Sequence, residues 1–197
     1  MCVHLSDNKG WLATFDFDEN LRRDAFDAVT ALQARGLTVH MLSGDTLAAA
    51  QRVAGQLGIQ NMQADCMPQT KLALMQALQA KGHKVLMVGD GLNDGPTLAA
   101  ADVSVAVGPA VPLAQAQSDL VLPGAQLVML PVMLDQARRT LRIIKQNLIW
   151  AAIYNATCVP LALGGLLPAW LAGLGMALSS LLVVANAARL SQFKPRV

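Results

Sequence analysis

Cysteine is scarce in this 197-residue sequence, and its pattern excludes two common kinds of stabilisation. The three cysteines are Cys2, Cys66 and Cys158, and they lack the close spacing of zinc-ligand pairs. The sequence therefore supports neither a disulfide framework nor a zinc site. The first ten residues, MCVHLSDNKG, also lack the continuous apolar core of a secretory signal peptide.

Charged and aromatic residues are few as well, at 14% and 4% of the chain, whereas 54% is hydrophobic. Soluble domains usually have about 25% charged residues, so part of this chain is not expected to face water. Residues 1–134 contain 8 Lys and Arg against 12 Asp and Glu, whereas residues 135–197 contain 7 against 1. The net charge of +2 thus combines an acidic and a basic part. We expect no nucleic-acid partner for either part.

Two long uncharged stretches in the basic part indicate a membrane hairpin. They run from Asn147 to Leu167 and from Ala169 to Ala188. Each is long enough, as a helix, to cross the roughly 30 Å hydrocarbon core of a bilayer. The basic residues that flank them are Arg138, Arg139, Arg142, Lys145, Arg189, Lys194 and Arg196. The positive-inside rule then predicts a multi-pass membrane protein with both ends of the hairpin in the cytosol. The alternative is a pair of helices buried in a soluble protein.

The acidic part alternates apolar runs with amphipathic stretches, a pattern typical of a parallel sheet with crossover helices. Runs typical of buried strands occupy residues 37–45, 83–91, 102–108 and 119–123. The stretches at helical spacing between them end at Gly36, Gly58 and Gly82, and glycine often follows a helix. The sequence therefore predicts a doubly wound α/β fold.

Ligands of such folds bind where the parallel strands end. Asp45 and Asp90 each follow a strand and a glycine, so two carboxylates are expected to converge there. The turn GDGLND adds Asn93 and Asp94. Mg²⁺ prefers oxygen ligands and usually takes few protein carboxylates, keeping its other positions for water and phosphate, and Asp90 suits this role best.

Two further side chains fit a phosphoryl group at the same edge. Ser43 is able to donate a hydrogen bond to a phosphoryl oxygen, and Lys71, near the start of a helix after Pro68, places a cation beside it. Each residue alone is a weak indication. The ordered set of Ser43, Lys71, Asp90 and Asp94 is a much stronger one.

Three of these segments resemble a known family. MLSGD, MPQTKLA and MVGDGLNDGPTLAAADVSVAVG are similar to the phosphorylation-domain motifs of P-type ATPases, and more narrowly of the heavy-metal-transporting branch. The segment FDFDENLRRDAFDAVTALQARG resembles the place where these pumps return from the nucleotide-binding domain. The resemblance implies a haloacid-dehalogenase-like fold, ATP as substrate, and an aspartyl-phosphate cycle that uses Mg²⁺. The residues it implies are Ser43, Gly44, Asp45, Lys71 and Asn93 for catalysis, and Asp90 and Asp94 for Mg²⁺.

The hairpin carries the resemblance into the membrane. YNATCVP and GMALSSLLVVANAARL resemble the last two helices of copper(I) pumps. The sequence of the final helix is most similar to the bacterial exporters that supply cytochrome oxidase assembly. This implies a bacterial inner membrane, Cu⁺ as the transported ion, and a copper chaperone or acceptor as partner. A thioether suits soft Cu(I), and polar groups inside a span are costly. The implied copper path consists of Tyr154, Asn155, Met176, Ser179 and Ser180.

Two motifs of the family do not occur in the sequence: the Asp-Lys-Thr-Gly of the phosphorylated aspartate and the intramembrane Cys-Pro-Cys. We therefore expect the C-terminal part of a pump, inactive alone, whose partners are the rest of the pump and the lipid bilayer. Residues 1–20 are expected to end the nucleotide-binding domain and residues 21–133 to form the phosphorylation domain. A basic stalk helix (134–146), two transmembrane helices (147–190) and a cytosolic tail (191–197) complete the expected organisation.

Two other functions fit parts of the sequence. In a membrane-anchored phosphatase, Asp16 would attack the substrate and Asp18 would act as general acid and base. The residues after Asp18 argue against a phosphatase, since they are Glu19 and Asn20. Phosphatases of this fold usually have Gly or Thr at these positions, in a compact loop. The second alternative is a non-catalytic metal-binding membrane fragment.

Overall fold

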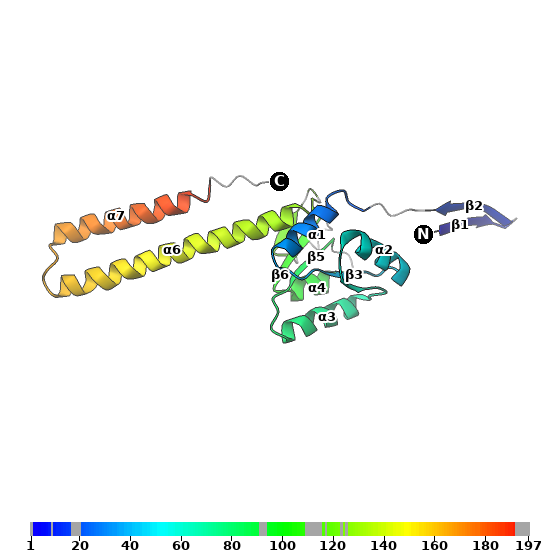
Figure 1. Ribbon diagram of the computed structural model, residues 1–197, viewed down its shortest axis with the longest axis horizontal. Helices are drawn as coiled ribbons and strands as arrows, with labels where there is room; N and C mark the ends of the chain where they lie inside the picture. Colours follow the sequence, from blue (N-terminus) through cyan, green and yellow to red (C-terminus); the bar gives the residue numbers. More distant parts are fainter. Residues whose placement is uncertain are drawn as a thin grey trace. The chain divides into compact units, whose positions relative to one another are not determined.

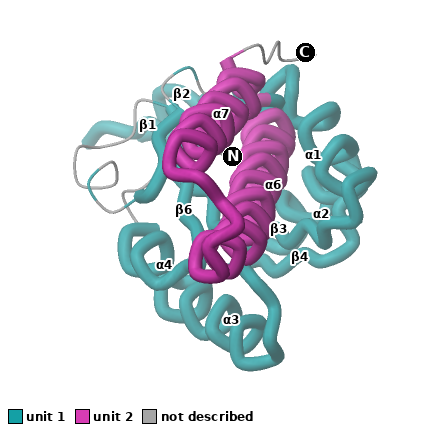
Figure 2. Tube along the Cα trace, turned by 90° about the vertical axis from the view of Figure 1, so that its left-hand side faces the viewer, with its two compact units in different colours: residues 1–128 teal, residues 129–197 magenta. Residues whose placement is uncertain are grey.

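The computed structural model describes residues 2–8, 10–16, 21–90, 94–108, 116, 118–122, 124 and 126–191. The chain forms two compact units, residues 1–128 and 129–197 (Figure 2). All described strands belong to the first unit, together with helices α1 to α4. The second unit contains α6 and α7.

An antiparallel hairpin of β1 (Cys2–Asp7) and β2 (Gly10–Asp16) begins the first unit. Cys2 lies opposite Asp16, and the register shifts between Leu5 and Ser6. The position of β2 agrees with the apolar run before Asp16, whereas nothing in the sequence pattern predicts β1. Trp11 and Phe15 remain exposed on this hairpin.

The remaining strands form two parallel groups (Figure 1). In the first group β3 (His40–Leu42) pairs with β4 (Asn61–Gln63). In the second, β5 (Leu86–Gly89) pairs with β6 (Val103–Val107), which pairs with β7 (Leu120–Leu122). The predicted α/β class with parallel strands is confirmed. Among the described residues, however, β3 and β5 do not pair with each other, so the sheet consists of two parts.

Among the described residues, four helices connect these strands: α1 (Ala25–Ala34), α2 (Leu47–Leu57), α3 (Pro68–Ala80) and α4 (Gly95–Ala100). Gly58 caps α2 with a φ of 66°, and Gly82 follows α3 with a φ of 85°. Glycine adopts this left-handed conformation without the steric cost that a Cβ brings. The helix ends predicted at these glycines are therefore correct.

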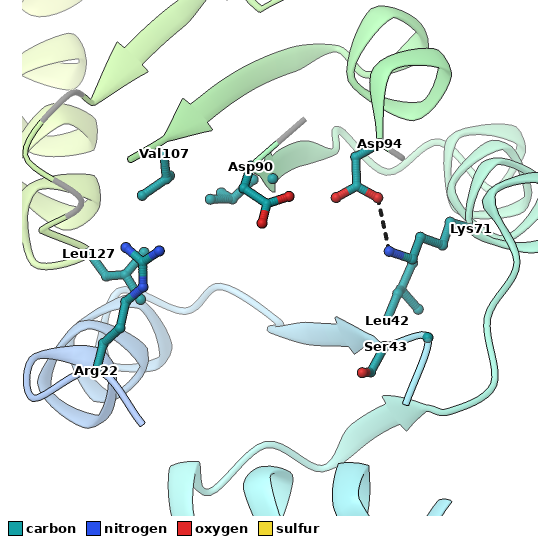
Figure 3. A pocket seen from close by; sticks show the side chains of 11 residues that line it. Arg22, Leu42, Ser43, Lys71, Asp90, Asp94, Val107 and Leu127 are labelled. Carbon is teal, nitrogen blue, oxygen red and sulfur yellow. Dashed lines mark hydrogen bonds and ion pairs between the residues drawn. The ribbon is translucent and has the colours of Figure 1, made fainter. Parts of the chain in front are cut away.

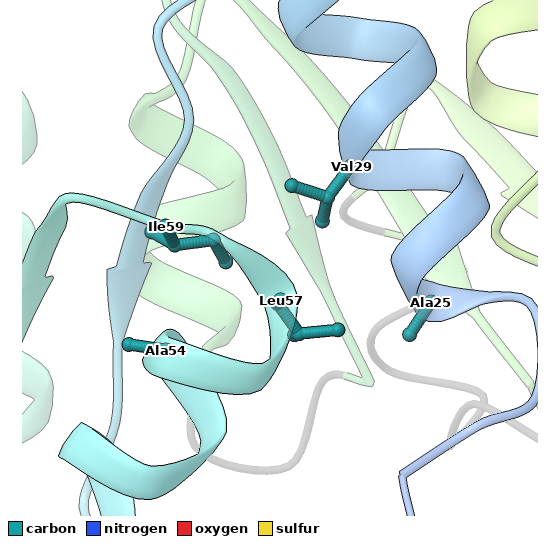
Figure 4. Packing of buried hydrophobic residues seen from close by; sticks show 5 residues of the cluster. All are labelled: Ala25, Val29, Ala54, Leu57 and Ile59. Carbon is teal, nitrogen blue, oxygen red and sulfur yellow. The ribbon is translucent and has the colours of Figure 1, made fainter.

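The main buried cluster lies between α1 and α2 (Figure 4). Its members are Ala25, Val29, Ala54, Leu57 and Ile59. Small side chains such as alanine let two helices approach closely, and the larger side chains fill the space that remains. Partly buried side chains from β3 and from the segments that flank α1 and α6, including Met41, Leu21 and Leu127, pack against this cluster. The cluster therefore fixes the segments that border the functional site.

The second unit is a helical hairpin. α6 (Met129–Leu163) and α7 (Ala169–Ala188) run antiparallel, since Asn186 Nδ2 donates to Asn147 Oδ1 at 2.9 Å and Trp150 Nε1 donates to Ser179 Oγ at 3.1 Å. Of the described helices, α7 is the one that is long and apolar enough to cross a membrane. Its bounds coincide with the second predicted span. The first predicted span lies in the C-terminal half of α6 and the turn that follows, and is more polar.

Asp102, just before β6, joins three elements of the first unit through its carboxylate. It accepts hydrogen bonds from Gln79 Nε2 (3.1 Å) on α3, from Val85 N–H (3.1 Å) before β5, and from Lys84 Nζ (2.7 Å). These contacts lower the pKa of the Asp102 carboxyl from 3.8 to about 2, with the Lys84 hydrogen bond as the largest cause, followed by Val85 and Gln79. The charged form of Asp102 therefore favours the folded state.

Asp102→Asn is expected to lower the free energy of unfolding at neutral pH. Because the pKa of the folded state lies below that of the unfolded state, this stabilisation is fully present above about pH 4 and is lost as the pH falls toward about 2. Urea unfolding between pH 7 and pH 2.5 checks this: the difference between variant and wild type should shrink with acid. Asp65→Asn, an exposed substitution at a left-handed position that Asn tolerates, is the control. A difference that does not change with pH would contradict the assignment.

Candidate phosphoryl site

A pocket of about 340 Å³ lies where β3 and β5 end (Figure 3). Both strands contribute the last residues of their apolar runs and the turns that follow. The pocket is lined by Arg22, Leu42, Ser43, Gly44, Lys71, Val88, Gly89, Asp90, Asp94, Val107 and Leu127. Five of the seven predicted catalytic and Mg²⁺ residues are in this list: Ser43, Gly44, Lys71, Asp90 and Asp94.

The turn after β3 is held by its own side chains. Ser43 Oγ donates to Asp45 Oδ2 at 2.7 Å, and the Asp45 N–H donates to Ser43 Oγ at 3.1 Å. On the other side, the Ser43 carbonyl accepts from the Cys66 N–H at 2.9 Å. Ser43 and Gly44 thus line the pocket in a fixed turn, whereas Asp45 is not among the lining residues and binds Ser43 instead.

Lys71 and Asp94 form an ion pair inside the pocket. Lys71 lies in the first turn of α3, Asp94 is the N-cap residue of α4, and Nζ lies 2.9 Å from Oδ1. Their side chains are only 15% and 12% exposed, so bulk water screens the pair weakly. The second carboxylate oxygen of Asp94 approaches the backbone of Gly89, where a Cβ would lie 2.8 Å from it. Glycine at position 89 is therefore required for Asp94 to reach Lys71.

Asp90 directly follows β5, and its carboxylate points into the pocket (Figure 3). Its chemistry and that of Asp94 fit Mg²⁺, which binds proteins through one or two carboxylates and keeps several waters or phosphate oxygens. The described residues contain no cluster of three or more His, Cys, Asp or Glu that could hold a metal ion, so the protein side chains of this pocket would supply only part of its ligands. The donor set therefore fits a hard cation shared with a phosphate-bearing ligand.

Besides Asp45, three predicted residues are not placed in the pocket. Asn93 and Asp18 lie outside the described residues. Asp16 is the last residue of β2, in the separate antiparallel hairpin. The structure thus brings together the Ser43, Lys71, Asp90 and Asp94 set without a described aspartate from the N-terminal hairpin.

The predicted copper-path residues divide between two surfaces of the helical hairpin. Tyr154 and Ser179 lie in the seam between α6 and α7: Tyr154 Oη donates to the Ala172 carbonyl at 3.5 Å, and Ser179 Oγ accepts from Trp150. Asn155, Met176 and Ser180 are exposed, Met176 by 64%. At about 100° per residue, helical geometry puts these three on the same side of the antiparallel hairpin.

Comparison with known proteins agrees with this geometry. A family model of haloacid dehalogenase-like hydrolases matches residues 8–102. A cation-transporting P-type ATPase B of Mycobacterium leprae is 46% identical over 175 residues, which cover 89% of this chain and 23% of that protein. A copper-exporting P-type ATPase of the same organism is 43% identical over 173 residues, 88% of this chain and 22% of that protein.

A crystal structure of a zinc-transporting PIB-type ATPase superimposes with a TM-score of 0.82 and 34% identity, over 92% of this chain and 29% of that one. The chain belongs to the P-type ATPase family. It spans less than a quarter of the length of the two relatives that it matches. The predicted family resemblance and the haloacid-dehalogenase-like fold are thereby confirmed.

The sequence motifs of this P-type ATPase chain did not indicate every residue of the pocket. Arg22 lines it from the segment that resembles the return from the nucleotide-binding domain, where the sequence assigned it no role, and Leu127 lines it from a segment outside the quoted motifs. The Asp24 carboxylate, which accepts a hydrogen bond from the Val128 N–H at 3.1 Å, holds these two segments together. The residues are 104 positions apart, so no local pattern indicates their contact.

Gly89→Ala is expected to lower the free energy of unfolding by about 1–3 kcal/mol, the usual cost of overpacking a tightly packed position. The new Cβ would lie 2.8 Å from Oδ2 and 3.1 Å from Cβ of Asp94, so the ion pair with Lys71 must shift. Gly55→Ala in α2 is the matched control, because no atom lies within 4 Å of its Cβ and alanine favours a helix by about 0.5–1 kcal/mol. Urea unfolding measures both. Equal stability of Gly89→Ala and wild type would contradict the close approach.

Proposed function

We propose that the chain is the C-terminal part of an ATP-driven copper(I) exporter that works through an aspartyl-phosphate cycle. The observation that carries this proposal is the convergence of Ser43, Lys71, Asp90 and Asp94 on one pocket at the ends of β3 and β5. The 43–46% identity to cation- and copper-transporting P-type ATPases, over almost nine tenths of the chain, supports it.

The residues of the pocket would stabilise a phosphoryl group during its transfer. Lys71 provides a positive charge beside the phosphoryl oxygens, and the Gly44 backbone offers a hydrogen-bond donor. The Ser43 hydroxyl, which donates to Asp45 in this structure, would turn its single proton from Asp45 to a phosphoryl oxygen. Mg²⁺ held by Asp90 and Asp94 would neutralise part of the negative charge of the phosphate oxygens. Such preorganised groups stabilise the charge of the transition state without having to reorient.

The phosphorylated aspartate would come from another part of the pump. Among the described residues, β3 and β5 each have an edge without a strand partner, and their carboxyl ends line the same pocket. An extended segment between these edges would satisfy their backbone groups and end beside Lys71 and Asp90. We propose that this segment carries the aspartate that receives the phosphate from ATP, with Asn93 and Asp45 supporting the surrounding turns.

The second unit would anchor the pump and carry its cargo. We propose that α7 and the C-terminal half of α6 both span the bacterial inner membrane, with both ends of the hairpin in the cytosol. Residues 134–146 and the proposed first span belong to one continuous helix, α6, which supports a role as a rigid stalk. Cu⁺, received from a chaperone or passed to an acceptor, would move past Tyr154, Asn155, Met176, Ser179 and Ser180.

Asp90→Ala is expected to reduce copper transport at least about 100-fold, the usual effect of removing one preorganised electrostatic group from such a site. The protein is expressed in full from its own gene, and ATP-dependent Cu⁺ uptake is measured in inverted membrane vesicles. Asp27→Asn, an exposed change on α1 away from the pocket, is the control and should transport normally.

Copper transport by Asp90→Ala at the wild-type rate would contradict the proposed site. The same preparations distinguish the phosphatase alternative. Hydrolysis of a generic phosphate ester that requires Asp16, with no ATP-dependent transport, would favour that alternative.

Met176→Leu is expected to lower the affinity of the protein for Cu⁺ at least about tenfold, since leucine preserves the volume but lacks the soft thioether sulfur. Competition with a Cu⁺-selective chelator in detergent measures this affinity. Met67→Leu is the matched control, because Met67 is 69% exposed and Met176 is 64% exposed. Unchanged affinity of Met176→Leu would remove Met176 from the path, and an equal loss in both variants would indicate binding to any exposed methionine.

A further inference from the structure

Arg22 lies on the wall of the pocket opposite Lys71. It precedes α1, and Figure 3 shows its guanidinium group pointing toward Leu127 and Val107, on the side of the pocket across from Lys71. Lys71 approaches the pocket from α3 on the far side. The pocket thus has a cation on each of two facing walls. One comes from the segment before α1 and the other from α3.

The backbone around Arg22 is fixed at both ends. Leu21 packs against the buried cluster of α1 and α2. The Arg22 carbonyl accepts from the Ala25 N–H at 3.0 Å, and the Asp24 carboxylate accepts from the Val128 N–H at 3.1 Å. A side chain that starts from a fixed backbone loses less conformational entropy when it binds a ligand. Arg22 is therefore presented to the pocket from a rigid support.

The charges that line the pocket balance only when Arg22 is included. Asp90 and Asp94 contribute two negative charges, and Lys71 and Arg22 contribute two positive ones. Lys71 already neutralises Asp94 at 2.9 Å. Without Arg22 the lining residues would carry a net charge of −1, which disfavours a phosphoryl dianion. With Arg22 the pocket is neutral, and it stays neutral when a divalent cation and a phosphoryl dianion enter together.

We propose that Arg22 is a second phosphoryl-binding cation of this pocket. Its planar guanidinium is suited to two parallel hydrogen bonds to the oxygens of a tetrahedral oxyanion, a geometry that the point charge of Lys71 does not provide. Lys71 and Arg22 then hold the anion from opposite walls. The inference rests on the proposed function only for the chemical class of the ligand.

The test measures binding of inorganic phosphate, in the presence of Mg²⁺, to the full chain in detergent by isothermal titration calorimetry. Arg22→Gln is expected to weaken binding about tenfold, as expected for the loss of a charge-assisted bidentate contact. Arg22→Lys should lose less, because it keeps the charge but not the fork. Arg23→Gln is the matched control. It removes the same charge at the neighbouring residue, and the Arg23 side chain does not line the pocket.

Equal losses in Arg22→Gln and Arg23→Gln would reduce the effect to general electrostatics and overturn the proposal, as would unchanged binding in Arg22→Gln or no saturable binding to the wild type. Lys71→Gln tests whether phosphate binds in this pocket at all. If binding weakens in this variant but not in Arg22→Gln, the pocket binds phosphate without Arg22, and the proposal is wrong. If Arg22→Gln fails to fold by circular dichroism, Arg22→Lys decides.

The inference and the proposed function fail in different ways. Phosphate binding that depends on Arg22, in a protein that transports no copper, leaves the inference standing and removes the exporter. Copper transport together with phosphate binding that is unaffected at Arg22 removes the inference alone.

Discussion

The ion pair between Lys71 and Asp94 is the interaction on which the pocket depends. It connects α3, which follows the β3–β4 pair, to the start of α4, which follows β5, and so joins the elements behind the two parts of the sheet. Removing one partner of this mostly buried pair would leave the other charge behind without compensation, which lowers the free energy of unfolding. Gly89 makes the contact possible, since any side chain there would meet the Asp94 carboxylate.

The opposite wall of the pocket depends on a contact between distant parts of the sequence. Asp24 and Val128 are joined by a hydrogen bond, and their neighbours Arg22 and Leu127 both line the pocket. Leu127 also packs against the cluster of α1 and α2. The hydrophobic core therefore positions this wall, whereas the ion pair positions the other. A phosphoryl group in the pocket would contact both walls, one held by the hydrophobic core and the other by the ion pair.

The sequence predicted those features that local chemistry determines. Helices that end at Gly58 and Gly82, and the start of α3 at Pro68, follow from backbone preferences of single residues. The grouping of Ser43, Lys71, Asp90 and Asp94 follows from motif order and from the rule that parallel strands end together. β4 was missed because three residues, Asn61–Gln63, are too few and too polar to show a period. The binding of Ser43 by Asp45 and the position of Arg22 depend on tertiary contacts, which no local pattern contains.

The C-terminal half of α6 contains more polar side chains than α7, and several of them form hydrogen bonds with α7. Asn147 binds Asn186, Trp150 binds Ser179, and Tyr154 binds a carbonyl of α7, so these three polar side chains of α6 find partners within the hairpin. A hydrogen bond across two helices offsets part of the cost of placing such groups in hydrocarbon. The lower hydropathy of α6 is therefore compatible with a membrane span whose polar side packs against α7. Asn155, Met176 and Ser180 lie outside this seam, and their common side is the surface where we propose that a soft ion finds ligands.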